Sequence, residues 1–350
     1  MSATSVPASV VDVFCGAGGL SYGFLEGGFT VVAGIDIDEE CRHPYTTNVQ
    51  APFLRRDVAE LSAHDVDELY IPSLPKVLVG CAPCQPFSTY NHKNDDPKWR
   101  LLSAFARLIV ETQPDVVSME NVPQLLNFRD GAVFKSFIET LRGAGYRANY
   151  KVLYGPDFGM AQTRSRLVLL AARGVAPELP MPTHFGNHRT VNDEIGALPA
   201  LTAGGVDPDD RLHRASGLSD KNLRRIRASK QGGTWRDWPG NLVADCHRNE
   251  RGRSYSSVYG RMSLDRPAPT ITTQFYGFGN GRFGHPKQDR ALSLREGAML
   301  QGFPRNYSFL PEDSKVAFKS IGRMIGNAVP VPLARAIAGA VKKHLDRHYG

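Results

Sequence analysis

The sequence predicts an α/β protein built on a doubly wound sheet, followed by a smaller and irregular second part. Short apolar strands alternate with amphipathic helices over the first 180 residues, which is typical of a mostly parallel sheet covered by helices. A glycine-rich turn joins the first strand to the first helix. Regular spacing stops near residue 174, where three prolines fall within 174–182, and it returns only near the end of the chain.

The predicted strands are short, apolar and rich in β-branched residues, as strands buried on both faces are. We expect them at residues 9–14, 31–35, 76–79, 115–119 and 167–171. Apolar residues at helical spacing predict helices at 20–25, 101–111, 133–141 and 331–345. The last helix carries Lys342, Lys343 and His344 near its end, where positive charge suits the helix dipole.

Bulk composition narrows the class of protein. Hydrophobic residues make up 41% and charged residues 22% of 350 residues, as in ordinary globular domains. No apolar run approaches the roughly 18 residues of a membrane span, and the N-terminus lacks the pattern of a secretion signal. Five cysteines, an odd number, suit a reducing compartment. We therefore expect a cytoplasmic protein without a membrane partner.

Charge is distributed unevenly along the chain. Residues 1–220 carry a net charge of −7, whereas residues 221–350 carry +14. Such asymmetry fits a surface that faces a polyanion, although a solvated basic face would give the same count. A basic cluster expected to be helical comprises Lys221, Arg224, Arg225, Arg227 and Lys230. Further basic residues that could reach bases or phosphates are Arg236, His247, Arg248, Arg251 and Arg253.

The glycine-rich turn, residues 14–19, is a candidate ligand-binding loop. Glycines allow a backbone to turn sharply and approach a ligand, but this turn lacks the dinucleotide pattern and could be a plain strand-end turn. Asp36 stands 20 residues after Gly16, at the end of the next strand, where a carboxylate can accept hydrogen bonds from ribose hydroxyls. Asp57, within 55–58, could bind an adenine amino group. The three features in order predict a nucleotide or nucleoside site.

A second set of residues carries chemistry. Cys81 and Cys84 follow an apolar strand in a CxxC pattern, which leaves open a nucleophile, a zinc or redox site, or an inert buried thiol. A zinc site would need two more ligands, and the sequence has no second CxxC pair to supply them. A redox site would not explain the glycine loop. Glu120 ends another strand, so strand ends should gather Cys84, Glu120 and Asp36 at one edge. Arg164 and Arg166, two apart, would share one face of a strand.

The chain as a whole resembles the C5-cytosine DNA methyltransferase family. The segments that carry the resemblance, in order, are Pro-Cys-Gln at 83–85, Glu-Asn-Val at 120–122, Gln-x-Arg-x-Arg at 162–166, Arg-Pro-Ala-Pro-Thr with Ile-Thr at 266–272, and Gly-Asn-Ala-Val-Pro at 326–330. The resemblance implies a Rossmann-like sheet that binds S-adenosylmethionine, with S-adenosylhomocysteine as product and no metal. It also implies a smaller target-recognition domain for duplex DNA, with no obligate protein partner.

The resemblance assigns roles to residues. Cys84 would add to carbon 6 of a cytosine flipped out of the duplex, making carbon 5 nucleophilic. Glu120 would be protonated or share a proton with N3, Arg166 would hold the O2 edge, and Arg164 would support the loop or the thiolate. The residues implied for the cofactor are Phe14, Gly16, Ala17, Gly19, Asp36, Ile37, Asp57, Val58, Pro83, Leu101 and Asn327.

The implied domains are a discontinuous catalytic domain, 1–182 plus 315–350, and a recognition domain, 183–314. Residues 87–99 would form a lid over the base, although a plain surface loop is the alternative. Two positions depart from the family: Cys81 stands where glycine is common, and Lys98 where arginine is frequent. We expect Cys84→Ala to abolish methylation and Cys81→Gly to be tolerated. A tRNA methyltransferase and a non-catalytic DNA-binding protein are the alternative functions.

Overall fold

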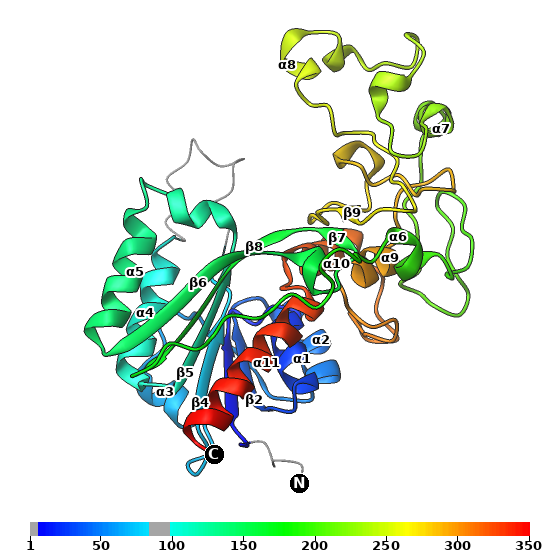
Figure 1. Ribbon diagram of the computed structural model, residues 1–350. Coiled ribbons are helices and arrows are strands. Elements are labelled where there is room, and N and C mark those ends of the chain that lie inside the picture. The colour runs from blue at the N-terminus through cyan, green and yellow to red at the C-terminus, as the bar shows by residue number, and fades with distance from the viewer. Residues whose placement is uncertain (1–5, 84–98) are drawn as a thin grey trace. The chain divides into compact units, whose positions relative to one another are not determined.

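The structure is a computed structural model that describes residues 6–83 and 99–350 (Figure 1). The described chain forms two compact units. The first takes its residues from Met1–Phe158, Ser165–Thr183 and Ala328–Gly350, and the second comprises Gly159–Arg164 and His184–Asn327. These units are defined by contacts between residues. The division into a catalytic domain, 1–182 plus 315–350, and a recognition domain, 183–314, stays a prediction.

The first unit is built on a seven-stranded sheet with the order β3-β2-β1-β4-β5-β8-β6. The strands β1 to β5 are mutually parallel, and β8 runs antiparallel to both β5 and β6. This arrangement confirms the predicted α/β fold. The strand bounds are β1 Ser9–Val13, β2 Thr30–Asp36, β3 Phe53–Arg55, β4 Lys76–Gly80, β5 Val116–Asn121, β6 Tyr146–Tyr154 and β8 Ser165–Arg173.

Helices cover both faces of this sheet because its central strands are mostly apolar and fully buried. All residues of β1 and β5 are buried, so each face needs an apolar cover. Side chains of α3, α4 and α5 share one core cluster with the sheet, while α1 packs on α11. The bounds are α1 Gly19–Glu26, α2 Arg42–Val49, α3 Ala63–Asp67, α4 Arg100–Thr112, α5 Ala132–Gly143 and α11 Val331–His348.

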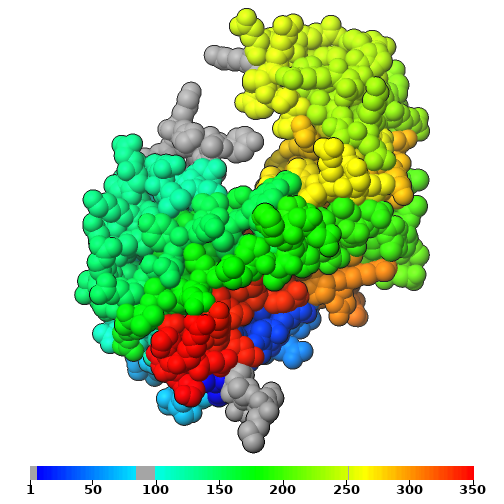
Figure 2. Space-filling model, viewed as in Figure 1, coloured from blue at the N-terminus to red at the C-terminus, as the bar shows by residue number. Residues whose placement is uncertain are grey.

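The pairing of α1 with α11 joins segments from opposite ends of the sequence. Figures 1 and 2 show the red α11 beside the blue N-terminal segments. Glycines on α1 permit the close approach: a β-carbon at Gly23 would lie 2.4 Å from the Ala334 side chain, and one at Gly27 would lie 2.9 Å from that of Ala338. The last segment of the chain is therefore an integral part of the first unit.

The second unit contains short elements separated by long loops. A small apolar cluster includes Ile226, Trp235, Trp238 and Phe278. The second unit also contains a buried ion pair, in which both Nη atoms of Arg290 donate to the Glu296 carboxylate, at 2.8 and 2.6 Å. The bounds are β7 Gln162–Thr163, β9 Ala268–Pro269, α6 Val191–Ile195, α7 Asp220–Ala228, α8 Glu250–Arg253, α9 Leu294–Leu300 and α10 Phe318–Asn327.

One helical stretch of the described chain, Phe318–His348, is long and apolar enough to cross a membrane by length and composition alone. Of its most apolar window, 61% is buried inside the structure. That degree of burial is typical of helices that line a protein core.

Candidate active site

The predicted site residues of the first unit gather where its parallel strands end. Strand pairing aligns Val13 with both Ile35 and Gly80, and Gly80 with Met119. The strand order reverses between β1 and β4, and such a switch point at the carboxyl edge is where open α/β sheets bind ligands. The residues that follow these strand positions are Phe14, Asp36, Cys81 and Glu120.

The glycine-rich turn has the backbone geometry that its composition predicts. Phe14, Gly16 and Gly18 all have positive φ, at 64°, 52° and 91°. A β-carbon at Gly16 would meet nothing within 4 Å, so a ligand has room to approach its backbone. The helix α1 begins at Gly19 without a side-chain cap, and its N-terminal dipole favours a negatively charged ligand group.

Asp36 is held firmly beside this turn. Its Oδ2 accepts the Gly16 N–H at 2.9 Å, and its Oδ1 accepts the Asp38 N–H at 2.9 Å. Burial raises the pKa of Asp36, and these N–H donors oppose the shift. Each oxygen keeps a lone pair that can accept a ribose hydroxyl. The next residue, Ile37, is 63% exposed and offers an apolar surface that a purine ring could cover.

The other residues implied for the cofactor differ in how they could contribute. Ala17 and Val58 are buried, so only their backbone could meet a ligand. Asp57 is half-buried and accepts the Ala59 N–H at 2.9 Å. Asn327 is exposed and belongs to the second unit. Pro83 and Leu101 are half-buried in the first unit. The open backbone at Gly16, the fixed carboxylate and the exposed isoleucine fit S-adenosylmethionine.

A buried carboxyl group that the sequence did not single out lies beneath the turn. Asp12, on β1, is fully buried and accepts a 2.6 Å hydrogen bond from the Ser21 hydroxyl, which also contacts the Tyr45 hydroxyl at 2.9 Å. Burial raises the pKa of Asp12 to about 7, and the Ser21 hydrogen bond partly counteracts it. The sequence offered one sign of this group, because Asp12 is a charged residue within a mostly apolar predicted strand.

Glu120 is 2% exposed at the end of β5 and faces two different groups. Arg166 Nε lies 2.8 Å from its Oε1, while the Cys81 thiol donates to its Oε2 at 2.8 Å. The arginine contact is ionic rather than directional, so Oε1 accepts no hydrogen bond within the described residues. The guanidinium of Arg166 compensates part of the cost of burying Oε1, and a ligand donor would complete its hydrogen bonding.

The loop after β4 is tied to the end of β5 at two neighbouring points. One is the Cys81–Glu120 hydrogen bond, and the other is the 3.0 Å bond from the Asn121 amide to the Ala82 carbonyl. Cys84 follows Pro83, the last residue described before the gap, and itself lies outside the described residues, as do residues 87–98 of the expected lid. The partnership of Cys81 with Glu120 was missed in the sequence.

The two arginines do not share a strand face, contrary to expectation. The chain leaves β7 at Thr163 and enters β8 at Ser165, so Arg164 lies at a break between two sheets. Arg164 is buried in the second unit and donates to the carbonyls of Ile271 and Gly326, at 2.8 and 3.0 Å. Arg166 belongs to the first unit, beside Glu120. The short β7 pairs with β9 in a separate sheet, so residues 162–166 do not form the single strand that was expected.

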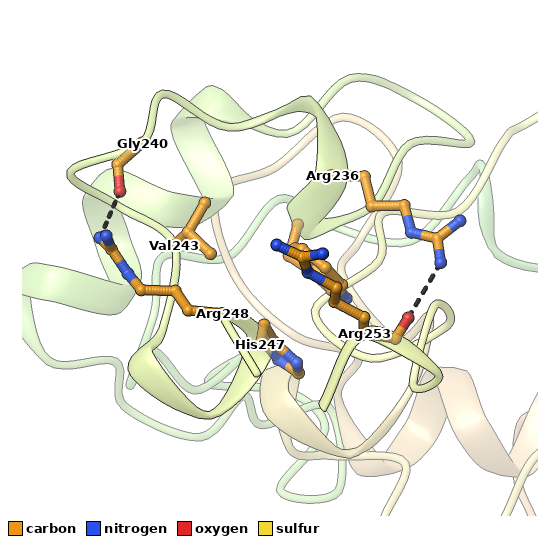
Figure 3. Close-up of a pocket in the computed structure, with 7 residues that line it drawn as sticks. Arg236, Gly240, Val243, His247, Arg248 and Arg253 are labelled. Carbon is orange, nitrogen blue, oxygen red and sulfur yellow. Dashed lines mark hydrogen bonds between the residues drawn. The ribbon is translucent and has the colours of Figure 1, made fainter. Parts of the chain in front are cut away.

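The second unit carries a pocket of about 600 Å³ rich in basic groups (Figure 3). The rings of Trp235 and His247 stack inside it, with centroids 4.5 Å apart. His247 Nδ1 lies 3.1 Å from the Gly252 carbonyl and must donate to it, while buried Nε2 has no hydrogen-bond partner in the described chain. The lining residues are Trp235, Arg236, Gly240, Val243, His247, Arg248 and Arg253.

The expected basic helix exists as α7, but only part of it faces solvent. Lys221 and Arg224 are exposed, whereas Arg225 is buried and donates to the Leu242 carbonyl at 2.8 Å. Arg227 contacts Asp289 at 3.4 Å. Of Arg251 the structure describes only the backbone. Among the described residues, no group of three or more His, Cys, Asp or Glu could hold a metal ion.

Comparison with known proteins agrees with these features. A family model described as C-5 cytosine-specific DNA methylase matches residues 8–343. The Type II methylase M.HgiDII of Herpetosiphon aurantiacus is 51% identical over 341 residues, which cover 97% of this chain and 96% of the relative. The Type II methyltransferase M1.HphI of Haemophilus parahaemolyticus is 33% identical, covering 95% of this chain and 86% of the relative.

The fold has a counterpart among solved structures. A prophage-encoded protein of E. coli, described as a DNA modification methyltransferase, superposes with a TM-score of 0.75 at 22% identity, covering 97% of this chain and 99% of the other. Similarity at this identity supports the fold, and the family follows from the sequence matches. The chain therefore belongs to the family of C-5 cytosine-specific DNA methylases and is a DNA (cytosine-5)-methyltransferase, with S-adenosylmethionine as the methyl donor that this family implies.

Proposed function

We propose that the chain methylates carbon 5 of a cytosine flipped out of a specific duplex sequence, through a covalent bond between Cys84 and carbon 6. The observation that carries this proposal is the buried carboxylate of Glu120, whose Oε1 accepts no hydrogen bond from the described residues. That carboxylate is tied to the loop that runs into Cys84. An acid and a thiol at one strand edge are what addition to a pyrimidine requires.

The residues divide the work on the ring. The Cys84 thiolate adds to carbon 6, and the electron pair of the 5,6 double bond moves toward carbon 5 and N3. Glu120 Oε1 shares a proton with N3, which stabilises the negative charge that develops there, and it can also accept a hydrogen bond from the amino group of the base. Arg166 keeps the carboxylate in place and presents its Nη2, which donates to no described group, to O2. A base then removes the carbon 5 proton, and the thiol is eliminated.

The cofactor site is proposed at the other end of the same edge. Asp36 would accept the ribose hydroxyls, Ile37 would cover the adenine, and the backbone at Gly16 would approach the amino acid portion. Phe14, Ala17, Gly19, Asp57, Val58, Pro83, Leu101 and Asn327 are the remaining proposed contacts. When bound, S-adenosylmethionine supplies a methyl group on a positively charged sulfur, to which the activated carbon is nucleophilic.

The second unit is proposed to read the DNA. Its pocket combines arginine donors with a flat aromatic wall, and Lys221 and Arg224 on α7 would contact phosphates. The relatives are named Type II methylases, so we propose a role in restriction-modification on nucleoid DNA in the cytoplasm. Protection of plasmid DNA from a restriction enzyme of the same target sequence would test this role.

The test begins with bisulfite sequencing of DNA from cells that express the chain, which identifies the methylated sequence. A duplex with 5-fluorocytosine at that position blocks loss of the carbon 5 substituent, so the covalent complex should accumulate and map to Cys84. Cys84→Ser should form none, and Glu120→Gln should form it at least about a hundredfold more slowly. Methylation of tRNA alone would overturn the substrate, and an adduct at another residue would overturn the nucleophile.

A further inference from the structure

Cys81 occupies a position where a glycine would be expected, yet it contacts the catalytic carboxylate. Pairing of Gly80 with Met119 places Cys81 beside Glu120 across the two central strands β4 and β5. The thiol is half-buried and points its hydrogen at Oε2, 2.8 Å away. Glycine at this position would have no side chain to make that bond.

The bond separates the two carboxylate oxygens by role. Oε2 is occupied by the thiol, while Oε1 faces Arg166 and accepts no hydrogen bond from the described chain. Rotation of the carboxylate out of this plane would break both contacts, and only a half-turn, which exchanges two equivalent oxygens, would restore them. A thiol is a weak donor, but its 2.8 Å hydrogen bond to Oε2 opposes that rotation.

We propose that Cys81 is a positioning residue that fixes the Glu120 carboxylate so that Oε1 alone meets the target cytosine. This inference rests on the proposed role of Glu120, and it assigns the thiol of Cys81 a function distinct from nucleophilic attack. It replaces the expectation, drawn from the sequence, that Cys81→Gly would be tolerated. The hydrogen bond from the Asn121 amide to the Ala82 carbonyl holds the backbone of the same loop beside β5.

The contribution of Cys81 is measured by comparing alanine, glycine and serine in its place. Cys81→Ala and Cys81→Gly remove the donor and should lower kcat about tenfold, because a carboxylate that can rotate is correctly placed for less time. The KM for target DNA should change less than about twofold, since the base still meets the same groups. Cys81→Ser keeps an O–H donor and should restore kcat to within about threefold of wild type.

A matched control separates this effect from loss of a buried thiol. Cys41 is buried elsewhere in the first unit, and Cys41→Ala should leave kcat unchanged while lowering the melting temperature. Equal kcat in wild type, Cys81→Ala and Cys81→Gly would overturn the proposal, as would failure of serine to restore it. If wild type formed no adduct with the 5-fluorocytosine duplex, the proposed function itself would fail, whatever the Cys81 variants do.

Discussion

Gly19 lies directly against Val329: a β-carbon at Gly19 would stand 2.3 Å from the Val329 carbonyl oxygen. Gly19 was expected to line the cofactor site, and the structure shows that it also has a packing role. The first turn of α1 can therefore approach the segment that leads into α11 only if residue 19 lacks a side chain.

We expect Gly19→Ala to destabilise the first unit by about 3 kcal/mol, because the backbone at residue 329 has to move. Gly339→Ala is the matched control, since a β-carbon there meets nothing within 4 Å and alanine favours helix by about 1 kcal/mol. Urea unfolding of the two variants should thus shift in opposite directions. Equal midpoints would show that the contact between residues 19 and 329 is easily relaxed.

Arg164 is expected to matter for the stability of the second unit. Arg164→Lys cannot reach the carbonyls of Ile271 and Gly326 together, and leaving a buried carbonyl without a donor costs roughly 1–3 kcal/mol. The melting temperature should fall accordingly, whereas Arg305→Lys, at an exposed position, should leave the melting temperature nearly unchanged. A variant with unchanged stability and a large loss of kcat would instead support the role that the family resemblance implies for Arg164, support of the loop or the thiolate.

Asp12 should make the first unit less stable as pH rises. Its pKa is about 7 in the folded chain against 3.8 as the reference value, so the folded state binds more protons between these limits. The stabilisation is complete below pH 4 and is lost by pH 7, up to about 4 kcal/mol. Asp12→Asn should remove this slope in urea unfolding from pH 5 to pH 8. The same slope in both proteins would contradict the assignment.

His285 should act in the opposite direction in the second unit. Its Nδ1 accepts the N–H groups of Lys287 and Gln288, and burial lowers its pKa to about 4. The unfolded chain then binds more protons between pH 6.5 and 4, so stability is lost as pH falls through that range. His285→Asn, which keeps an acceptor, should flatten the loss. Hydrogen exchange of the second unit at pH 7 and pH 5 would measure it.

The basic residues of the second unit should divide into two kinds. Arg253→Ala in the pocket should relax the methylated sequence at one position, at a cost of roughly 1–3 kcal/mol for the preferred base. Lys221→Ala on α7 should weaken all sequences alike and reduce the salt dependence by about one counterion. Sequencing of methylated libraries and binding at several salt concentrations would separate them. Identical behaviour of both variants would rule out base reading by the pocket.

The central strands and the long helices could be predicted because burial leaves a clear mark on sequence. Residues 76–79 and 115–119 are short and mostly apolar, and they match β4 and β5 within two residues. The strand β6 was not predicted, since most of its residues are exposed or half-buried at the sheet edge and its sequence carries no apolar run. Local pattern reports burial, and an exposed strand depends on its neighbour for stability.

The candidate site was predictable as a set of strand ends but not as a set of contacts. Alignment of the parallel strands follows from the fold, so Asp36 and Glu120 could be expected at one edge. The Cys81–Glu120 bond depends on register between β4 and β5, which spacing along one strand does not reveal. The position of Arg164 depends on the break between β7 and β8, where pairing with β9 begins.

The packing of α1 on α11 also sets an order of events during synthesis. Before the ribosome reaches the last stretch of the first unit, Ala328–Gly350, it makes residues 184–327, which takes roughly 7–29 s at about 5–20 residues per second. Throughout that interval α1 exposes the glycine-lined face that later receives Ala334 and Ala338. The core of the first unit therefore stays incomplete during this interval, and all residues of the second unit are synthesised before α11 can pack on α1. Holding chaperones would have their longest opportunity to act in this interval.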